Sequence, residues 1–288
     1  DVLKHFVLVL AIEHLKLKPQ PFRVVDTHAG VGIYDLDGIE AGKTGEWQGG
    51  IGRLLGAELS PAATAIVAPY LAIVRRYVGE RNEPAAATRR YPGSPLIARE
   101  LLRSGDVLVA NELHTEDRAG LEQTFFRDSQ VKVLGLDGYL VAKSTLPPKE
   151  RRGLVVIDPP FEVAGEFDRL HAAMMEVHRR FAGGIQLIWY PVKDAVAVEC
   201  FKRQVAASPL PKTLFAELAI RSRTSGDGGL TASGVLVVNP PYTLPDRLAV
   251  ALPELARVLS GGPTAGGRHD WGWLIEERLT TVSTINST

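Results

Sequence analysis

Val155-Val156-Ile157-Asp158-Pro159-Pro160-Phe161 is the segment of this chain with the most specific structural meaning. Its three β-branched apolar residues predict a strand that is buried on both faces, as strands of parallel sheets are. Proline cannot continue a central strand, so the strand ends at Asp158. In open α/β sheets the ligand crevice lies outside such strand ends. The segment therefore predicts a carboxylate at the edge of a ligand site.

The turn that follows this strand also bears on function. An Asp/Asn-Pro-Pro-aromatic turn resembles the catalytic motif of S-adenosylmethionine-dependent methyltransferases that modify amino groups. The resemblance implies that Asp158 and the carbonyl of Pro159 accept the two hydrogens of the target amine, while Phe161 stacks on the flat substrate. A plain corner between strand and loop is the alternative, because Asp and Pro are common there. The motif alone leaves both interpretations open.

Length and composition restrict the class of protein. The 288 residues suit one large α/β domain or a domain with an insertion, and the 45% hydrophobic content is ordinary for a globular protein. No apolar run is long enough to span a bilayer and no signal peptide is recognised, so we expect a cytoplasmic protein without a membrane partner. The single cysteine, Cys200, suits a reducing compartment. Neither His nor Cys has metal-ligand spacing, so we expect no metal site, and the zero net charge restricts any RNA-binding surface to a local patch.

Hydrophobic periodicity predicts a Rossmann-like α/β fold, with a seven-stranded, mostly parallel sheet and helices on both faces. An amphipathic helix is expected over residues 2–18, where apolar and polar residues alternate at helical spacing. Pro19 and Pro21 end it. The expected strands span residues 22–26, 107–112, 131–134, 155–158, 185–189, 214–220 and 235–238.

Residues 37–90 stand where a simple unit of this fold would continue to its second strand. A glycine-rich segment followed by an Ala/Val/Leu-rich stretch predicts a small helical insertion after the first strand. The expected domains are a main domain of residues 1–36 and 91–275, an insertion subdomain of residues 37–90, and a polar tail of residues 276–288. Five arginines of the insertion form either a solvated helix face or a phosphate-binding patch: Arg75, Arg76, Arg81, Arg89 and Arg90.

Polar residues at turns and strand ends outline a nucleoside site. The first strand opens into Asp26-Thr27-His28-Ala29-Gly30, which resembles the short acidic-then-glycine turn of methyltransferases; a simple βα turn that needs glycine is the alternative. Ser94 precedes a proline and predicts a helix N-cap, at which its hydroxyl serves either the cap or a ligand. Glu112 ends the second strand, where a carboxylate binds ribose hydroxyls. Asp137-Gly138 follows the third strand, at the position where methyltransferases bind the adenine ring of S-adenosylmethionine.

Asn239-Pro240-Pro241-Tyr242 is a second copy of the amine-methylation pattern. Only one copy can be the active site, and the catalytic turn of this fold follows the fourth strand, beside the first. We therefore predict that Asn239–Tyr242 is a structural corner near the sheet edge, away from the cofactor.

Eight segments together resemble the bacterial family called ribosomal large subunit methyltransferase J, which methylates adenine N6 in 23S ribosomal RNA. They are residues 1–5 (DVLKH), 26–30 (DTHAG), 91–99 (YPGSPLIAR), 111–114 (NELH), 137–138 (DG), 158–161 (DPPF), 189–191 (WYP) and 230–234 (LTASG). The resemblance runs over nearly the full chain. It implies the fold of a class I S-adenosylmethionine-dependent methyltransferase.

The family resemblance implies roles for individual residues. Asp158, Pro159, Phe161 and Lys4 would form the catalytic group, with Asp158 at the amine and Lys4 near the active site. S-adenosylmethionine would be bound by His5, His28, Gly30, Ser94, Glu112, Asp137, Gly138 and Asp158. Two departures stand out: the family carries a His- and Gly-rich segment ahead of the first motif, and it usually has tyrosine where this chain has Phe161, so a hydroxyl hydrogen bond is lost while stacking is kept.

The expected function is therefore direct methyl transfer from S-adenosylmethionine to N6 of an adenine in 23S rRNA, by a monomer. A DNA adenine-N6 methyltransferase and a protein glutamine-amide methyltransferase are the alternatives within the enzyme class. An inactive RNA-binding module is the alternative outside it, although an intact Asp158 with an aromatic neighbour argues against that module.

Overall fold

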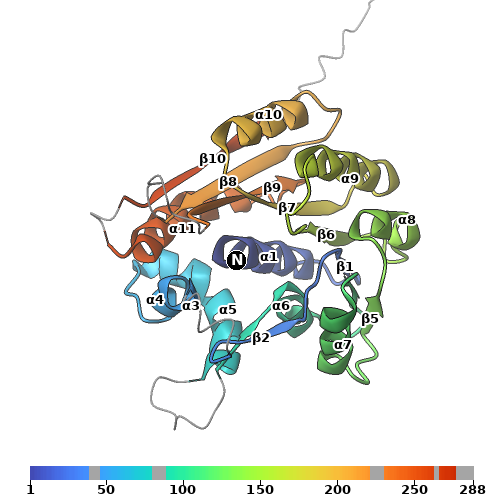
Figure 1. Cartoon of the computed structure of the whole chain (residues 1–288), viewed down its shortest axis with the longest axis horizontal. Helices are drawn as coiled ribbons and strands as arrows, with labels where there is room; N and C mark the ends of the chain where they lie inside the picture. The colour runs from blue at the N-terminus through green and yellow to red at the C-terminus, as the bar shows by residue number, and fades with distance from the viewer. Residues whose placement is uncertain (39–45, 80–88, 221–229, 263–265, 277–288) are drawn as a thin grey trace, which may run out of the picture.

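A central sheet organises the molecule (Figure 1). The structure is a computed structural model that describes residues 1–38, 46–79, 89–220, 230–262 and 266–276. The sheet has eight strands in the order β10-β8-β9-β7-β6-β1-β4-β5. These strands are β1 (Arg23–Asp26), β4 (Val107–Asn111), β5 (Val131–Leu134), β6 (Gly153–Ile157), β7 (Ile185–Pro191), β8 (Thr213–Ala219), β9 (Ala232–Val238) and β10 (Arg268–Ile275). The predicted Rossmann-like α/β class is confirmed, with eight strands rather than seven.

Strand direction divides the sheet into two parts. β7, β6, β1, β4 and β5 run parallel to their neighbours in that order. β9 is antiparallel to β7, and β8 and β10 continue this antiparallel part to the edge. β1 lies between β4 and β6, at the point where the chain order reverses, so the carboxyl ends of these three strands meet at one edge.

β10 is the strand of the central sheet that the sequence did not predict. It pairs with β8 at the edge of the sheet. Its first three residues, Arg268, His269 and Asp270, are exposed and polar, and Gly272 interrupts the apolar residues after them. A half-exposed edge strand of this kind lacks the run of β-branched residues that marks a buried strand.

The first helix, α1 (Val2–Lys16), is buried over its first three turns, from Leu3 to Ile12. The amphipathic interpretation is wrong there, because α1 packs against β6, β7 and β9 on one side and against α5 and α6 on the other. Figure 1 shows α1 at the centre of the molecule. Lys4 and His5 are carried into the interior with it, at 5% and 2% exposure.

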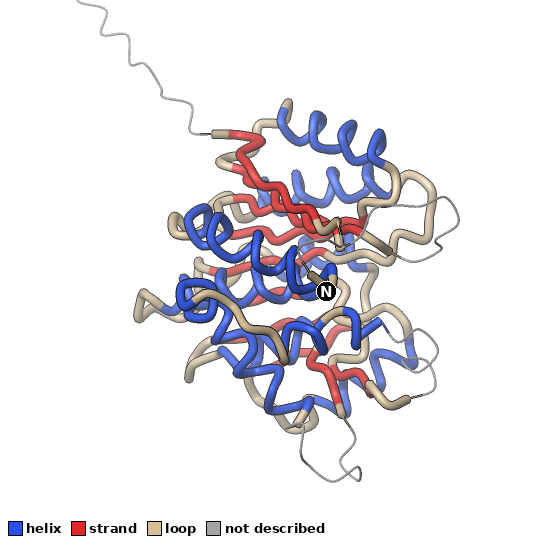
Figure 2. The backbone as a smooth tube through the Cα atoms, turned by 90° about the vertical axis from the view of Figure 1, so that its left-hand side faces the viewer, coloured by secondary structure: helices blue, strands red, loops and turns tan. Residues whose placement is uncertain are grey.

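Helices cover both faces of the sheet (Figure 2). Each face has its own apolar cluster of buried side chains. The cluster that contains α1 also receives side chains from α5 (Pro61–Val78), α6 (Ser94–Leu101), α7 (Thr115–Thr124) and α11 (Leu244–Ser260). The opposite cluster receives side chains from α8 (Val141–Thr145), α9 (Glu166–Arg180) and α10 (Ala195–Ala206). Among the described residues, no helix is both long and apolar enough to cross a membrane.

The insertion is closed at its base by a short antiparallel pair, β2 (Ile33–Asp35) with β3 (Arg90–Pro92). Between these strands lie α3 (Glu46–Gly49), α4 (Ile51–Leu55) and α5. Val67, Tyr70 and Val74 of α5 are buried in the same cluster as α1. The division of the chain into a main domain and an insertion subdomain stays a prediction.

The predicted arginine cluster is distributed over several environments. Arg76 pairs with Glu100 at 2.5 Å. Arg89 pairs with Asp37 at 2.6 Å and lies over the ring of Trp47 at 5.0 Å. Arg75 and Arg90 are exposed, while Arg81 lies outside the described residues. At least two of the five side chains therefore already have protein partners.

The second copy of the methylation motif follows β9. The amide of Asn239 donates to the carbonyl oxygens of Ala182 at 2.8 Å and Gly184 at 2.9 Å, so it holds a loop. The motif does lie away from the turn after β1. The reason is strand direction: β9 is an interior strand that runs antiparallel to β7, so its carboxyl end lies at the end of the sheet opposite to the carboxyl ends of β1 and β6. The expected placement at the sheet edge is wrong.

Candidate active site

A cavity of about 810 Å³ lies outside the carboxyl ends of β1, β4 and β6. Ten of the residues proposed from the sequence line it: Lys4, His5, His28, Gly30, Ser94, Glu112, Asp137, Gly138, Asp158 and Pro159. Phe161 is the exception. No group of three or more potential ligands that could hold a metal ion is found in the described part of the chain. The chain thus brings these side chains to one place, while the role of each remains a prediction.

Asp158 forms an ion pair with Lys4 at the floor of the cavity. A hydrogen bond joins Lys4 Nζ to Asp158 Oδ2, and Asp1 Oδ1 lies 3.1 Å from the same ammonium. Burial acts to lower the pKa of Lys4, but the charge of Asp158 and its hydrogen bond outweigh burial and raise that pKa above 10.5. Lys4 therefore stays protonated at neutral pH and stabilises the carboxylate beside it.

Asp26, at the end of β1, is a second buried carboxyl group close to this pair. It is 1% exposed, and its Oδ2 accepts a hydrogen bond of 2.6 Å from Ser94 Oγ. Burial raises the pKa of Asp26 to about 6, and the hydrogen bond from Ser94 and the charge of Lys4 limit the shift. Ser94 is the first residue of α6 and Gly93 is the N-cap, so the predicted N-cap position of Ser94 is wrong by one residue. Its hydroxyl binds Asp26 instead of capping the helix.

Glu112 connects the glycine turn to the end of β4. Its Oε2 accepts from the amide of Gly30 at 2.8 Å and its Oε1 accepts from the amide of His114 at 2.8 Å. Gly30 has φ +61°, and a Cβ at this position would collide with the hydroxyl of Tyr34. The turn therefore needs glycine, and the carboxylate of Glu112 is held at the rim of the cavity.

The opposite wall is formed by Asp137, Gly138 and the aromatic residues next to them. Asp137 Oδ1 accepts from the amide of Tyr139 at 2.9 Å and caps the short helix η1 (Gly138–Leu140). A Cβ at Gly138 would collide with the ring of His28, which explains the glycine. His28 packs edge-on against Tyr139 at 5.4 Å, and burial lowers the pKa of His28, so the ring is neutral at pH 7.

Phe161 does not line the cavity. Its φ is +54°, and its ring packs edge-on against Phe167 at 5.1 Å and against Trp189 at 6.0 Å. Trp189 does line the cavity, and its indole Nε1 is buried without a hydrogen-bond partner among the described residues. In this structure Phe161 supports an aromatic wall, and stacking of Phe161 on substrate stays a prediction.

Sequence reasoning did not propose several other residues that line the cavity: Tyr34, Asp117, Tyr139, Glu166, Arg169 and Trp189. Tyr139 donates to Glu166 at 2.5 Å, and Arg169 lies 4.4 Å above the ring of Tyr139. Tyr139 directly follows the Asp137-Gly138 motif, and Trp189 is the first residue of the Trp-Tyr-Pro motif. Both residues therefore belong to or adjoin a motif that the sequence shows. Arg169 and Glu166 belong to the helix after the motif and had no local signal.

Comparison with known proteins adds independent evidence. The family model described as "Ribosomal RNA large subunit methyltransferase D, RlmJ" matches residues 19–275. A protein named Ribosomal RNA large subunit methyltransferase J from Haemophilus influenzae is 42% identical over 271 residues, with 94% of each chain covered. The protein of that name from Escherichia coli is 39% identical over 277 residues, with 96% of this chain and 95% of that one covered.

A solved structure agrees with the sequence comparison. The crystal structure of a Legionella pneumophila protein superposes with a TM-score of 0.82 at 29% identity, over 94% of this chain and 96% of that one. Fold, motif order and sequence identity thus point the same way, and the chain belongs to the RlmJ family of ribosomal RNA large subunit methyltransferases.

Proposed function

We propose that this protein transfers a methyl group from S-adenosylmethionine to N6 of an adenine in 23S rRNA. The observation that carries the proposal is the position of Asp158, paired with Lys4 and facing the same cavity as Glu112 and Asp137. The family and the names of the relatives support a substrate in large-subunit rRNA. Such a substrate implies that the protein works in the cytoplasm.

The residues that line the cavity fit this cofactor. A volume of about 810 Å³ is in the usual range for a small-molecule site, roughly 300–1,000 Å³. Glu112 is positioned to accept hydrogen bonds from ribose hydroxyls, and Asp137 and Gly138 form the wall for the adenine ring. His5 Nε2 is a buried polar atom without a partner among the described residues, which is the condition expected where a ligand supplies the partner.

The chain's own residues would act on the amine. S-adenosylmethionine supplies an electrophilic methyl group on its sulfonium. Asp158 and the carbonyl of Pro159 would accept the two hydrogens of the adenine amino group and orient its nitrogen lone pair, which is otherwise delocalised into the ring. Alignment of this kind, in a preorganised polar site, is a large part of catalysis.

A proton must leave the nitrogen once the new N–C bond has formed. Asp158 is the carboxylate placed to accept it. The hydrogen bond from the ammonium of Lys4 holds the carboxyl group of Asp158 in a fixed orientation before that step. Because adenine N6 is unreachable inside a helix, the base has to be extruded from the RNA into the cavity.

We also propose that the protein acts as a monomer. The most exposed large aliphatic or phenylalanine side chains in the described part of the chain, Leu17, Phe126 and Val196, belong to separate elements, and a stable dimer needs a continuous apolar patch. Sedimentation velocity at micromolar protein concentration checks this, and a dimer peak there would contradict it.

The test of function is transfer of a tritiated methyl group to purified substrates. We expect label in deproteinised large-subunit rRNA, recovered after digestion as N6-methyladenosine, and none in duplex DNA or protein. Label in DNA, or in glutamine of protein, would establish the corresponding rival activity. No label in any substrate, with intact cofactor binding, would favour an inactive RNA-binding module.

A further inference from the structure

A row of three buried side chains connects the insertion to the cavity. The hydroxyl oxygens of Tyr70, on α5, and Tyr91, on β3, lie 2.8 Å apart. The hydroxyl of Tyr91 lies 2.6 Å from Nδ1 of His5, on α1. Tyr70 is 0% exposed and Tyr91 is 7% exposed. The far nitrogen of His5, Nε2, has no partner among the described residues, and His5 lines the cavity.

The proton positions in this row follow from the number of donors. Each hydroxyl has one hydrogen, and within the described residues the hydroxyl of Tyr70 has Tyr91 as its partner. Tyr70 keeps its buried hydrogen paired only by donating to Tyr91, so Tyr91 donates to Nδ1 of His5. The opposite direction would leave the Tyr70 hydrogen buried and unpaired, which costs free energy.

The His5 ring is neutral at physiological pH. Burial, with the nearby charge of Lys4, holds the pKa of His5 well below its usual value. A neutral imidazole whose Nδ1 accepts a hydrogen bond carries its one proton on Nε2. Nε2 of His5 is therefore a buried hydrogen-bond donor without a partner among the described residues, on a side chain that lines the cavity.

We propose that Tyr70 is a positioning residue: through Tyr91 it holds His5 in the tautomer whose Nε2–H donates to the α-carboxylate of the bound cofactor. This inference rests on the proposed function, because the acceptor belongs to S-adenosylmethionine. The α-carboxylate is the anionic group of that cofactor and needs a donor. The ammonium of Lys4 is already engaged with Asp1 and Asp158, whereas Nε2–H of His5 is not engaged.

The tautomer can be measured in the free protein. Tyr70→Phe keeps the ring and removes the hydroxyl. The hydroxyl of Tyr91 can then either donate to Nδ1 of His5 or accept from it. Tyr77→Phe is the matched control, because Tyr77 is on the same helix and its hydroxyl donates to Glu100 at 2.5 Å, away from His5. ¹⁵N NMR of the histidine-labelled full chain, with the signal identified by His5→Asn, reports which ring nitrogen carries the proton.

In the wild type and in Tyr77→Phe, we expect His5 to carry its proton on Nε2, and in Tyr70→Phe we expect a mixture of the two tautomers. A proton on Nδ1 in the wild type, or a Tyr70→Phe spectrum identical to that of the wild type, overturns the proposal. Neither result depends on the cofactor, so the spectra decide the proton relay even if the proposed function is wrong.

Calorimetry tests whether the α-carboxylate of the cofactor is the group that accepts from His5. If the competent tautomer falls to about half of the population, S-adenosylhomocysteine binds about twofold more weakly to Tyr70→Phe, and Tyr77→Phe is unchanged. Decarboxylated S-adenosylmethionine, which lacks the acceptor, should bind Tyr70→Phe and wild type equally. An equal loss for both ligands overturns the carboxylate assignment. No binding of either ligand to the wild type overturns the proposed function and that assignment together.

Discussion

At the residue scale, the cavity depends on charges that are buried in pairs. Lys4 and Asp158 are 7% and 16% exposed at their side chains, and each would be costly to bury alone. Asp26 lies nearby and pairs with a neutral hydroxyl instead of a cation. The site therefore contains one carboxyl group that is paired with a cation and another, Asp26, whose pKa is raised by burial.

Replacement of Asp158 tests the proposed catalytic carboxylate. Asp158→Ala removes the acceptor for the amine hydrogens, so we expect methyl transfer to fall by at least about 10²-fold while the affinity for S-adenosylhomocysteine stays within a few-fold. Tritium transfer and calorimetry measure the two quantities. Asn239→Ala, in the second copy of the motif, is the control and should keep its activity. Equal losses in the two variants would refute the assignment.

The pH dependence of stability tests Asp26. Its pKa in the folded protein, about 6, is above the usual 3.8, so the folded state binds the proton more tightly than the unfolded state does. This contribution to stability is present below pH 3.8 and is lost as the pH rises through 6. Asp26→Asn removes it, so the unfolding free energy of the variant relative to the wild type should increase by up to about 3 kcal/mol between pH 4 and 7. Urea unfolding at several pH values measures this, and a difference that does not vary with pH would contradict it.

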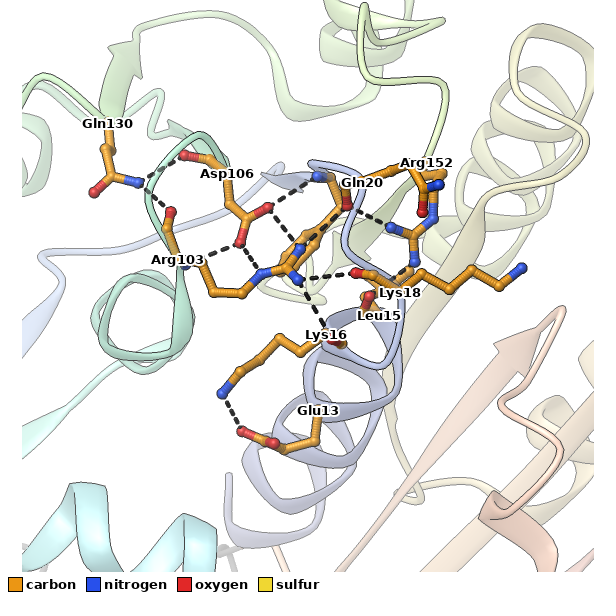
Figure 3. Close-up of polar contacts among 10 residues, drawn as sticks. Glu13, Leu15, Lys16, Lys18, Gln20, Arg103, Asp106, Gln130 and Arg152 are labelled. Carbon is orange, nitrogen blue, oxygen red and sulfur yellow. Dashed lines mark hydrogen bonds and ion pairs between the residues drawn. The ribbon is translucent and has the colours of Figure 1, made fainter.

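At the element scale, α1 carries Lys4 in its first turn and is anchored by two arginines at its other end. Figure 3 shows the guanidinium groups of Arg103 and Arg152 at the carboxyl end of this helix. Within α1, Arg103 donates to the carbonyl of Lys16 at 3.3 Å and Arg152 donates to that of Leu15 at 2.8 Å. In the segment that follows the helix, Arg103 also donates to the carbonyl of Lys18 at 2.8 Å and Arg152 to that of Gln20 at 2.6 Å. The last carbonyls of a helix lack partners within it and carry its negative dipole end, so two cations stabilise this end.

Arg152→Ala should destabilise the fold by about 1–3 kcal/mol, because it removes charged hydrogen bonds to carbonyls at the end of α1. Arg179→Ala is the control: Arg179 pairs with Glu176 on the exposed face of α9, where solvent screens the pair and its contribution to stability is small. Chemical denaturation of both variants measures the difference. If the two variants lost equal stability, Arg152 would have no special role at the end of α1.

At the scale of the whole molecule, the insertion and the sheet share one apolar cluster. Trp47 of α3 and Trp271 and Trp273 of β10 all pack against the cluster that contains α1. A separate subdomain would need its own core. We infer that the insertion helices are stable only when the sheet is folded.

A single unfolding transition is the expected consequence. With 5-fluorotryptophan in the chain, ¹⁹F NMR in urea resolves the indole of the insertion from those of β10. We expect the same midpoint and slope for Trp47, Trp271 and Trp273, because one cluster is lost at once. A lower midpoint for Trp47 alone would mean that the insertion unfolds independently and would support its description as a separate subdomain.

Local sequence was informative wherever a physical effect acts within a few residues. The β-branched run before Asp158 and the prolines after it placed a carboxylate at a buried strand end, and that strand is β6. Gly30, Glu112 and Asp137-Gly138 were recognised in the same way, and all line one cavity. Residues with no local signal were missed: β10 has an irregular polar start, and Arg169 reaches the cavity from the middle of a helical pattern.

Strand ends, turn glycines and the catalytic motif can be recognised from local sequence, because proline, glycine and β-branched side chains restrict the backbone at their own positions. Packing of the elements in three dimensions is what buries α1 from Leu3 to Ile12, brings Phe161 against Trp189, and separates Asn239 from Asp158 by the length of the sheet. It also decided which partner each buried charge has. Lys4 and Asp158 are separated by 154 positions, and no local pattern specifies a pair that is formed by packing one helix between a sheet and an insertion.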